Sequence, residues 1–182
     1  WFVLVLGNLG CRFGEARRLT WNNVKKIQKV EVDGRDQTQV TISFLKSQTK
    51  NKKARTAIGR RGDVFRTIQR HSNFTKPSDY VFVDNDTGDQ INRDVYYNHW
   101  HAMLEETGLQ ERSVESLSFY NIRHFFATQR LYSGANPYAL AKTMGCGIQY
   151  IWDHYGQVDV EKMAKDLTKQ VNYDKDGMVV IK

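Results

Sequence analysis

Four side chains of this sequence have the chemistry needed to cleave a phosphodiester without a metal ion: Arg12, Lys46, Arg123 and Tyr155. Such a reaction requires a nucleophile, a cationic clamp on the non-bridging oxygens and a proton donor for the departing oxygen. The planar guanidinium groups of Arg12 and Arg123 can each bind phosphate oxygens at two points, which a lysine cannot do. Tyr155 can act as the nucleophile, and Lys46 can protonate the leaving 5′ oxygen.

The positive charge of the chain is concentrated in one segment. Residues 46–70 contain nine basic residues against the single acid Asp63, a net charge of +8, whereas the whole chain carries +7. The rest of the protein is therefore nearly neutral, as expected for a globule with one surface facing a polyanion. The basic side chains that we predict to contact this polyanion are Lys50, Lys52, Lys53 and Arg55.

The composition is that of a soluble globular domain of 182 residues, with 40% hydrophobic and 26% charged residues and only two prolines. These values exclude disordered and collagen-like chains. No apolar run approaches the roughly 18 residues that a membrane span needs, and the first apolar run lacks the features of a secretory signal. Cys11 and Cys146 are isolated, so we expect two reduced thiols in an intracellular, cytoplasmic protein. Because the chain begins within an apolar segment and without a Met, we expect a fragment.

The elements that position these side chains are predicted to be mainly helical. Alternating residues around Asp33 and Gly34 indicate two strands joined by a tight turn, and a third strand follows the basic connection at residues 46–53, with Lys46 at a hairpin tip. Ser118 is placed to cap a helix, and Pro137 to open the next one. We predict an α+β fold, mainly α-helical, with a small antiparallel sheet.

The expected boundaries are as follows. Helices are predicted over residues 1–9, 14–21, 63–70, 93–106, 119–132, 148–154 and 159–170, and strands over residues 30–32, 40–44, 55–58 and 80–83. In the helix at residues 93–106, the side chains expected in the core are Val95, Trp100 and Leu104.

Four segments fall in one order along the chain. The first segment contains Arg12 and reads LGCRFGEA, followed by LTW, which is similar to a TGLRxxEL segment. The second contains Lys46 and reads FLKS, at the end of a predicted strand. The third contains Arg123 and reads YNIRHFFAT, which is similar to an HxxRHxxAT box. The fourth reads MGC, with Tyr155 nine residues after Cys146, and is similar to an LGH…Y box. Together these motifs, over about residues 3–165, resemble the catalytic domain of the tyrosine recombinase and phage integrase family.

The resemblance implies a function and an assembly. It implies site-specific recombination, with integration or excision of phage or other mobile DNA in a bacterial host cell. DNA would be cleaved and rejoined through a 3′-phosphotyrosine intermediate, without metal, ATP or another cofactor. The implied partner is double-stranded DNA, bound by a homotetramer on two sites that exchanges strands through a Holliday junction; the isolated protein would be a monomer.

The resemblance also implies a domain organisation. Residues 1–182 would form a single catalytic domain whose N-terminal core-binding domain is absent. Residues 159–182 would dock in trans on a neighbouring protomer.

Two family positions carry unusual residues. Tyr120 lies where the box has His, and its hydroxyl can still bind a phosphate oxygen. Cys146 lies where the last box has His or Trp, and a thiol is a poor hydrogen-bond donor. We predict supporting roles for Glu15, which would orient Arg12, and for His124 and His154.

Other functions stay open on the sequence alone. A type IB topoisomerase would use the same phosphotyrosine, and a catalytically weakened DNA-binding relative would account for Cys146 and Tyr120. Tyr150 is a weaker candidate nucleophile. His99 and His101 lack a third ligand, so no metal site is predicted.

Overall fold

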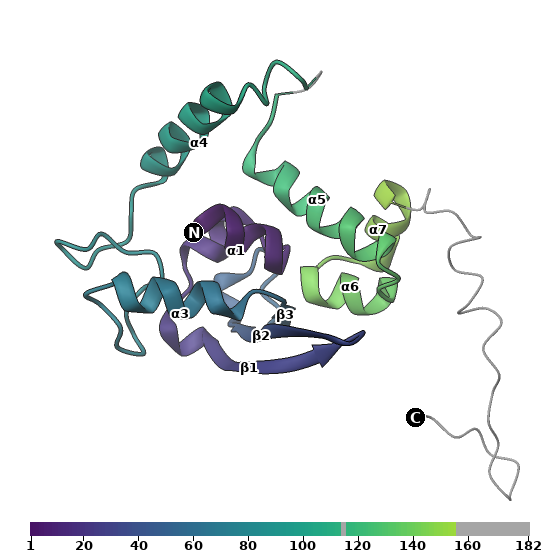
Figure 1. Cartoon of the computed structure of the whole chain (residues 1–182), viewed down its shortest axis with the longest axis horizontal. Coiled ribbons are helices and arrows are strands. Elements are labelled where there is room, and N and C mark those ends of the chain that lie inside the picture. Colours follow the sequence, from purple (N-terminus) through teal and green to yellow (C-terminus); the bar gives the residue numbers. More distant parts are fainter. Residues whose placement is uncertain (114–115, 156–182) are drawn as a thin grey trace, which may run out of the picture.

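The structure is a computed structural model that describes residues 1–113 and 116–155 (Figure 1). The predicted docking segment, residues 159–182, lies outside the described residues. Among the described residues, no helix has the length and apolar character to cross a membrane. The elements are α1 (Phe2–Leu9), α2 (Phe13–Arg17), η1 (Trp21–Asn23), β1 (Val24–Val32), β2 (Arg35–Phe44), η2 (Lys46–Gln48), β3 (Arg55–Gly59), α3 (Gly62–His71), α4 (Arg93–Thr107), α5 (Phe119–Tyr132), α6 (Pro137–Met144) and α7 (Ile148–Tyr155).

The three strands form one antiparallel sheet in the order β1-β2-β3. Asp33 and Gly34 both have positive φ, 51° and 71°, as a two-residue turn between right-twisted strands requires. This confirms the predicted hairpin, although β1 begins earlier than expected. At the far end of the sheet Phe44 pairs with Arg55, so the connection between β2 and β3 leaves the sheet there.

The main core lies between the sheet and α1. Alternate residues of β2, Val40, Ile42 and Phe44, are fully buried, together with Leu6 and Leu9 of α1. Burial of this kind stabilises the fold by about 25 cal/mol per Å² of apolar surface. In Figure 1, α1 lies above the sheet, with α5, α6 and α7 gathered to its right. These three helices share a second buried cluster that includes Phe126, Leu140, Met144, Ile151 and Tyr155.

The helix caps agree with the sequence. The Ser118 hydroxyl accepts from the Tyr120 N–H, and the Asn136 side chain accepts from the first N–H groups of α6, which Pro137 opens. The prediction that Val95 lies in the core is wrong. Tyr96, at spacings of four and eight residues from Trp100 and Leu104, occupies the buried face of α4, and Val95 is exposed.

The helix predicted at residues 14–21 is shorter than expected. It ends at Arg17 because the backbone of the next residues bonds to a distant segment: Val81 N–H donates to Leu19 O, and Trp21 N–H donates to Asp79 O. Residues 80–83 form only isolated bridges with Thr20 and Gln90 rather than a strand. Leu19 and Trp21 are nevertheless buried.

Candidate active site

Three arginines converge on the C-terminal end of α6. Carbonyl groups in the last turn of a helix have no partner within the helix and carry its negative dipole, so they attract cations. Each of three successive carbonyls accepts from a different arginine: Thr143 from Arg55 Nε at 2.9 Å, Met144 from Arg123 Nη1 at 2.8 Å, and Gly145 from Arg12 Nη2 at 3.3 Å. The predicted pair Arg12 and Arg123 therefore meets where α6 turns into α7.

Arg123 is the buried member of that pair, with 2% of its surface exposed. Its Nη1 also donates to Gly10 O at 2.6 Å, which ties α5 to the end of α1. Gly10 has φ 59°, and a Cβ there would overlap the Phe126 ring, so the close approach of the two helices requires glycine. Burial and the charge of Arg12 lower the pKa of Arg123. Its Nε is a buried donor without a partner among the described residues, a feature often seen where a ligand binds.

Arg12 is the accessible member, with 27% of its side chain exposed. It occupies the N-cap of α2, where its backbone N–H donates to Glu15 Oε2 at 2.8 Å and its Nη1 to Oε1 at 3.1 Å. Glu15 thus orients Arg12, the supporting role that the sequence suggests. Because the side chain is reached by solvent, an anion can approach Arg12 from outside.

Arg55 does not lie where the sequence analysis placed it. Its side chain is only 8% exposed, and its guanidinium group donates to both carboxylate oxygens of the buried Glu15, at 3.0 and 2.8 Å. The prediction that Arg55 contacts DNA therefore conflicts with its contacts. Burial opposes the ionisation of Glu15, but the hydrogen bonds and charge of Arg55, with help from Arg12, outweigh it and lower the pKa of Glu15.

The lowered pKa of Glu15 predicts how stability changes with pH. A carboxyl whose pKa is lower in the folded state stabilises that state above its unfolded pKa and loses this contribution as pH falls through the folded value. Glu15→Gln, which leaves Arg55 uncompensated, should lower the free energy of unfolding by about 3 kcal/mol at pH 7. Urea unfolding of wild type and variant at pH 7 and pH 4 measures this loss of stability. We expect the difference from wild type to shrink at the lower pH; an equal difference at both would contradict the ion pair.

Tyr155 and His124 form a direct contact. The Tyr155 hydroxyl lies 2.6 Å from Nδ1 of His124, one residue after Arg123 on α5. Tyr155 is 8% exposed. Burial raises the pKa of Tyr155, against the lowering effect of the Tyr150 hydroxyl and of the Arg123 charge. A neutral imidazole at this distance can accept the hydroxyl proton.

Tyr120 and Tyr150 form a second pair beside the first, with their hydroxyls 2.6 Å apart. The Tyr120 ring also packs edge-on against His124, with ring centroids 4.7 Å apart. Burial and the Tyr120 hydroxyl raise the pKa of Tyr150. His154 stacks on Tyr150 at 4.0 Å and bonds to the Tyr150 carbonyl, and its ring centroid lies 6.2 Å from that of His124 on α5.

Cys146 follows the three carbonyls and is half-buried. Its thiol points to Ala141 O at 3.9 Å, a weak contact. Burial raises the pKa of Cys146, although the charges of Arg123 and Arg12 oppose this. Cys146 therefore lies beside both arginines as a neutral thiol.

Lys46 differs in setting from the prediction. It opens the short turn η2 directly after β2, at the start of the connection between β2 and β3 rather than at its tip. That turn is held by the buried Gln48, whose amide bonds to Arg18 O and to the Asn23 side chain. The exposed Lys50, Lys52 and Lys53 extend further along the same connection.

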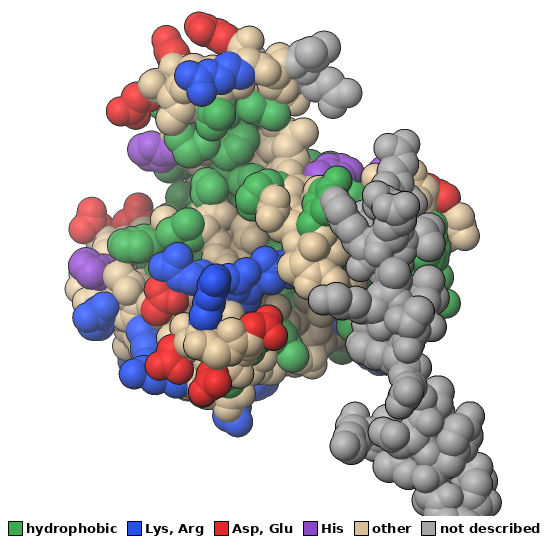
Figure 2. Space-filling model, turned by 45° about the vertical axis from the view of Figure 1, so that its right-hand side comes forward, with side chains coloured by type: hydrophobic (Ala, Val, Ile, Leu, Met, Phe, Trp, Pro, Cys, Tyr) green, Lys and Arg blue, Asp and Glu red, His purple; other side chains and the backbone are tan. Residues whose placement is uncertain are grey.

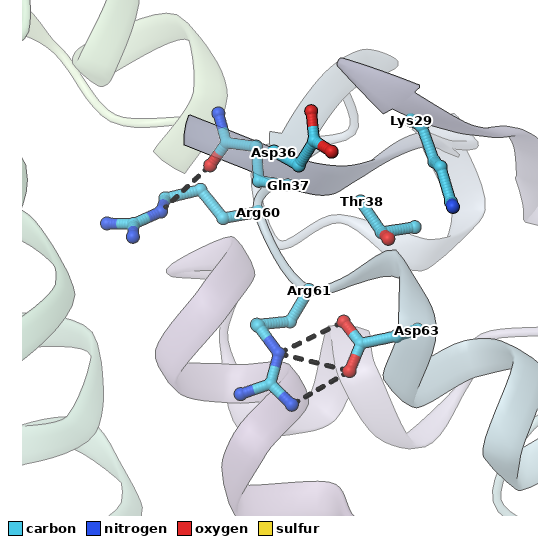
Figure 3. A pocket seen from close by; sticks show the side chains of 7 residues that line it. All are labelled: Lys29, Asp36, Gln37, Thr38, Arg60, Arg61 and Asp63. Carbon is cyan, nitrogen blue, oxygen red and sulfur yellow. Dashed lines mark hydrogen bonds and ion pairs between the residues drawn. The ribbon is translucent and has the colours of Figure 1, made fainter. Parts of the chain in front are cut away.

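The arginines in the later part of the basic segment, Arg60, Arg61 and Arg66, contact the β1–β2 hairpin and α3. In a pocket of about 350 Å³ beside the hairpin, Arg60 bonds to Gln37 of β2 and Arg61 pairs with Asp63 of α3 (Figure 3). Arg66 donates to Ile27 O of β1. The exposed lysines at residues 46–53 lie on the connection that leads to Arg55 of the arginine cluster. Figure 2 shows Lys and Arg side chains on one face, with Asp and Glu side chains among them, below hydrophobic ones.

Comparison with known proteins identifies the family. The model of the phage integrase family matches residues 1–161, most of the chain.

The chain belongs to the phage integrase family.

Solved structures of tyrosine recombinases share its fold. XerH site-specific recombinase bound to difH substrate matches at 15% identity and a TM-score of 0.60, over 93% of this chain and 46% of that one. The Tn1549 transposon integrase in complex with a circular intermediate DNA (16% identity, TM-score 0.59) and XerA recombinase (17%, 0.59) each match over 91% of this chain and 56% of theirs. The chain thus spans about half the length of these recombinases. No curated protein sequence matches it.

These findings confirm the predicted family and the mainly helical fold with a small sheet. The site also contains groups whose contacts differ from those predicted from the sequence. Arg55 was assigned to DNA, and the three carbonyls of residues 143–145 gave no signal because backbone atoms are common to all residues. Tyr150 was considered only as a nucleophile.

Proposed function

We propose that this chain is the catalytic part of a site-specific DNA recombinase that cleaves and rejoins double-stranded DNA through a phosphotyrosine, without metal or ATP. The observation that carries the proposal is the position of Tyr155. This residue lies on α7, the helix that follows the turn bound by Arg12 and Arg123, and its hydroxyl is 2.6 Å from Nδ1 of His124 on α5. Membership of the phage integrase family supports it. So do the neighbours XerH and Tn1549 integrase, which were solved with DNA.

The residues have separate roles in the proposed cleavage. Arg12 and Arg123 bind the non-bridging oxygens of the scissile phosphate, with Tyr120 as a further donor. Tyr155 passes its proton to Nδ1 of a neutral His124, and its oxygen forms the bond to phosphorus as the bond from phosphorus to the 5′ oxygen breaks. Lys46 gives a proton to that oxygen, which leaves as a hydroxyl. The phosphotyrosine preserves the bond energy, so a 5′-hydroxyl from a second strand can reverse the step.

The role of Lys46 predicts a selective rescue. Lys46→Ala should slow cleavage of ordinary DNA by about 10²- to 10⁴-fold, the usual contribution of a general acid. A substrate with sulfur in the 5′-bridging position has a leaving group that needs no proton, so the variant should cleave it at close to the wild-type rate. Single-turnover cleavage of both substrates gives the comparison. Equal defects on the two would remove Lys46 from this role.

The larger assembly is part of the same proposal. Exchange between two DNA sites through a Holliday junction requires four active sites, so we propose a homotetramer on DNA, with residues 159–182 docking on a neighbouring protomer. Phage or other mobile DNA in a bacterial cytoplasm is the proposed setting.

Covalent capture from a random pool of DNA tests the proposed function and finds the target site in the same experiment. The chain is incubated with a pool of duplexes that have randomised sequence and a nick. Cleavage near the nick releases a short fragment and leaves the protein joined to a 3′ end. We expect an adduct that survives denaturation and is enriched in one sequence. An adduct without enrichment, together with relaxation of supercoiled plasmid, would favour a topoisomerase; no adduct would favour a DNA-binding relative.

A further inference from the structure

The charge of Glu15 poses a problem for a phosphate site. Glu15 is 1% exposed and its carboxylate lies against Arg12, one of the two proposed clamp residues. An ionised carboxylate here would repel a phosphate and would compete with it for Arg12. A second cation next to Glu15 removes this conflict, and Arg55 is that cation, bonded to both oxygens.

Arg55 is also fixed to the turn between α6 and α7. Its Nε donates to Thr143 O at 2.9 Å, and its guanidinium carbon lies 4.2 Å above the Phe44 ring. Gly145 has φ 67°, and a Cβ there would come within 2.8 Å of Arg55 Cδ, so the backbone of the turn lies directly against the arginine side chain. All three nitrogens of the group donate to the protein.

This turn determines the direction of the groups that follow it. Its next two carbonyls accept from Arg123 and Arg12, and α7, which carries Tyr155, begins at Ile148. A shift of Thr143 would therefore move both clamp residues relative to the nucleophile. Displacements of about 1 Å at an active site can slow a reaction 10²-fold.

We propose that Arg55 is a positioning residue of the active site, which neutralises Glu15 so that Arg12 keeps its charge for the substrate phosphate, and which holds the turn that aligns the clamp with Tyr155. The proposal rests on the proposed function. It differs from a DNA-contact role, in which Arg55 would bind a phosphate of its own.

The test separates cleavage from binding. Using the duplex recovered by covalent capture, Arg55→Gln should slow single-turnover cleavage at saturating DNA by about 10²-fold. The slope of log Kd against log salt should equal that of wild type, because no phosphate contact is lost. Arg66→Gln removes an exposed arginine of the same segment and is the matched control, expected within about twofold of wild type. A slope smaller by about one, with normal cleavage of bound DNA, would overturn the proposal in favour of a DNA contact.

A second variant tests the charge argument. Adding Glu15→Gln to Arg55→Gln removes the uncompensated carboxylate, so the double variant should cleave about tenfold faster than Arg55→Gln alone. The double variant has neither the Glu15 carboxylate nor the Arg55 guanidinium, so it contains no unpaired member of this ion pair. If Arg55→Gln alone is unstable, the double variant can still be compared with wild type. If the double variant cleaved more slowly than Arg55→Gln, as expected when the losses of two independent substitutions add, the neutralising role would be overturned.

A measurement without DNA keeps this result distinct from a failure of the proposed function. The carboxyl carbon of Glu15, followed by NMR, should titrate at a higher pH in Arg55→Gln than in wild type, and in Arg66→Gln it should titrate as in wild type. An unchanged titration would contradict the proposal. Absence of an adduct with the wild-type chain would instead count against the recombinase function.

Discussion

Tyr155→Phe should abolish covalent attachment to DNA. The substitution removes one oxygen from a side chain that is 8% exposed and leaves its ring in the cluster of α5, α6 and α7. Loss of a nucleophile lowers the rate by about 10⁴-fold or more, since no other group supplies the bond to phosphorus. Adduct formation on the nicked duplexes, read on a denaturing gel, measures this effect.

The chain contains a well-matched control for that variant. Tyr150→Phe removes a hydroxyl from the same helix, and that hydroxyl bonds to Tyr120 rather than to His124. We expect it to retain adduct formation, with a loss of about tenfold at most, because the Tyr150 hydroxyl positions Tyr120 and lowers the pKa of Tyr155. If Tyr150→Phe abolished the adduct and Tyr155→Phe kept it, the assignment of the nucleophile would be reversed.

Arg123→Lys should have the next largest effect. Arg123 contacts Gly10 O and Met144 O through one nitrogen and leaves Nε without a protein partner among the described residues. A lysine has a single charged nitrogen, which cannot bind these carbonyls and clamp a phosphate together. We expect cleavage to slow by about 10³-fold or more, as found when an arginine that stabilises phosphoryl transfer is removed. Single-turnover cleavage at saturating DNA gives the rate.

Arg130→Lys is the control for this effect. Arg130 also has a buried Nε without a partner among the described residues, but it lies two turns further along α5, in the apolar groove beside α1 and outside the arginine cluster. Its replacement should leave cleavage within about twofold of wild type. A rate for Arg123→Lys close to that of Arg130→Lys would contradict the clamp.

Much of the site follows from the sequence because its residues lie in local motifs. Arg12 occupies the N-cap after Gly10, and Arg123 and His124 lie on a helix whose Ser118 cap is visible in the sequence. Each of these positions depends on a few neighbouring residues, so its element can be predicted from local pattern. The tight turn at Asp33 and Gly34 was predictable for the same reason.

The features that escaped prediction depend on contacts between distant segments. The inward direction of Arg55 depends on the pairing of Phe44 with Arg55 and on the ion pair of Arg55 with the buried Glu15 of α2. The early end of α2 follows from bonds to residues 79–81. In α4, a shift of one residue separates the exposed Val95 from the buried Tyr96, and the core that selects between them is formed by other elements.

The proposed mechanism depends most directly on which residue becomes joined to DNA. Digestion of the captured adduct with a protease and a nuclease, followed by mass spectrometry, locates the nucleotide-bearing residue. We predict a phosphodiester on Tyr155, within the peptide that continues from α7. A linkage at Tyr150 or Tyr120, or a wild-type chain that forms no adduct with any duplex of the pool, would contradict the mechanism.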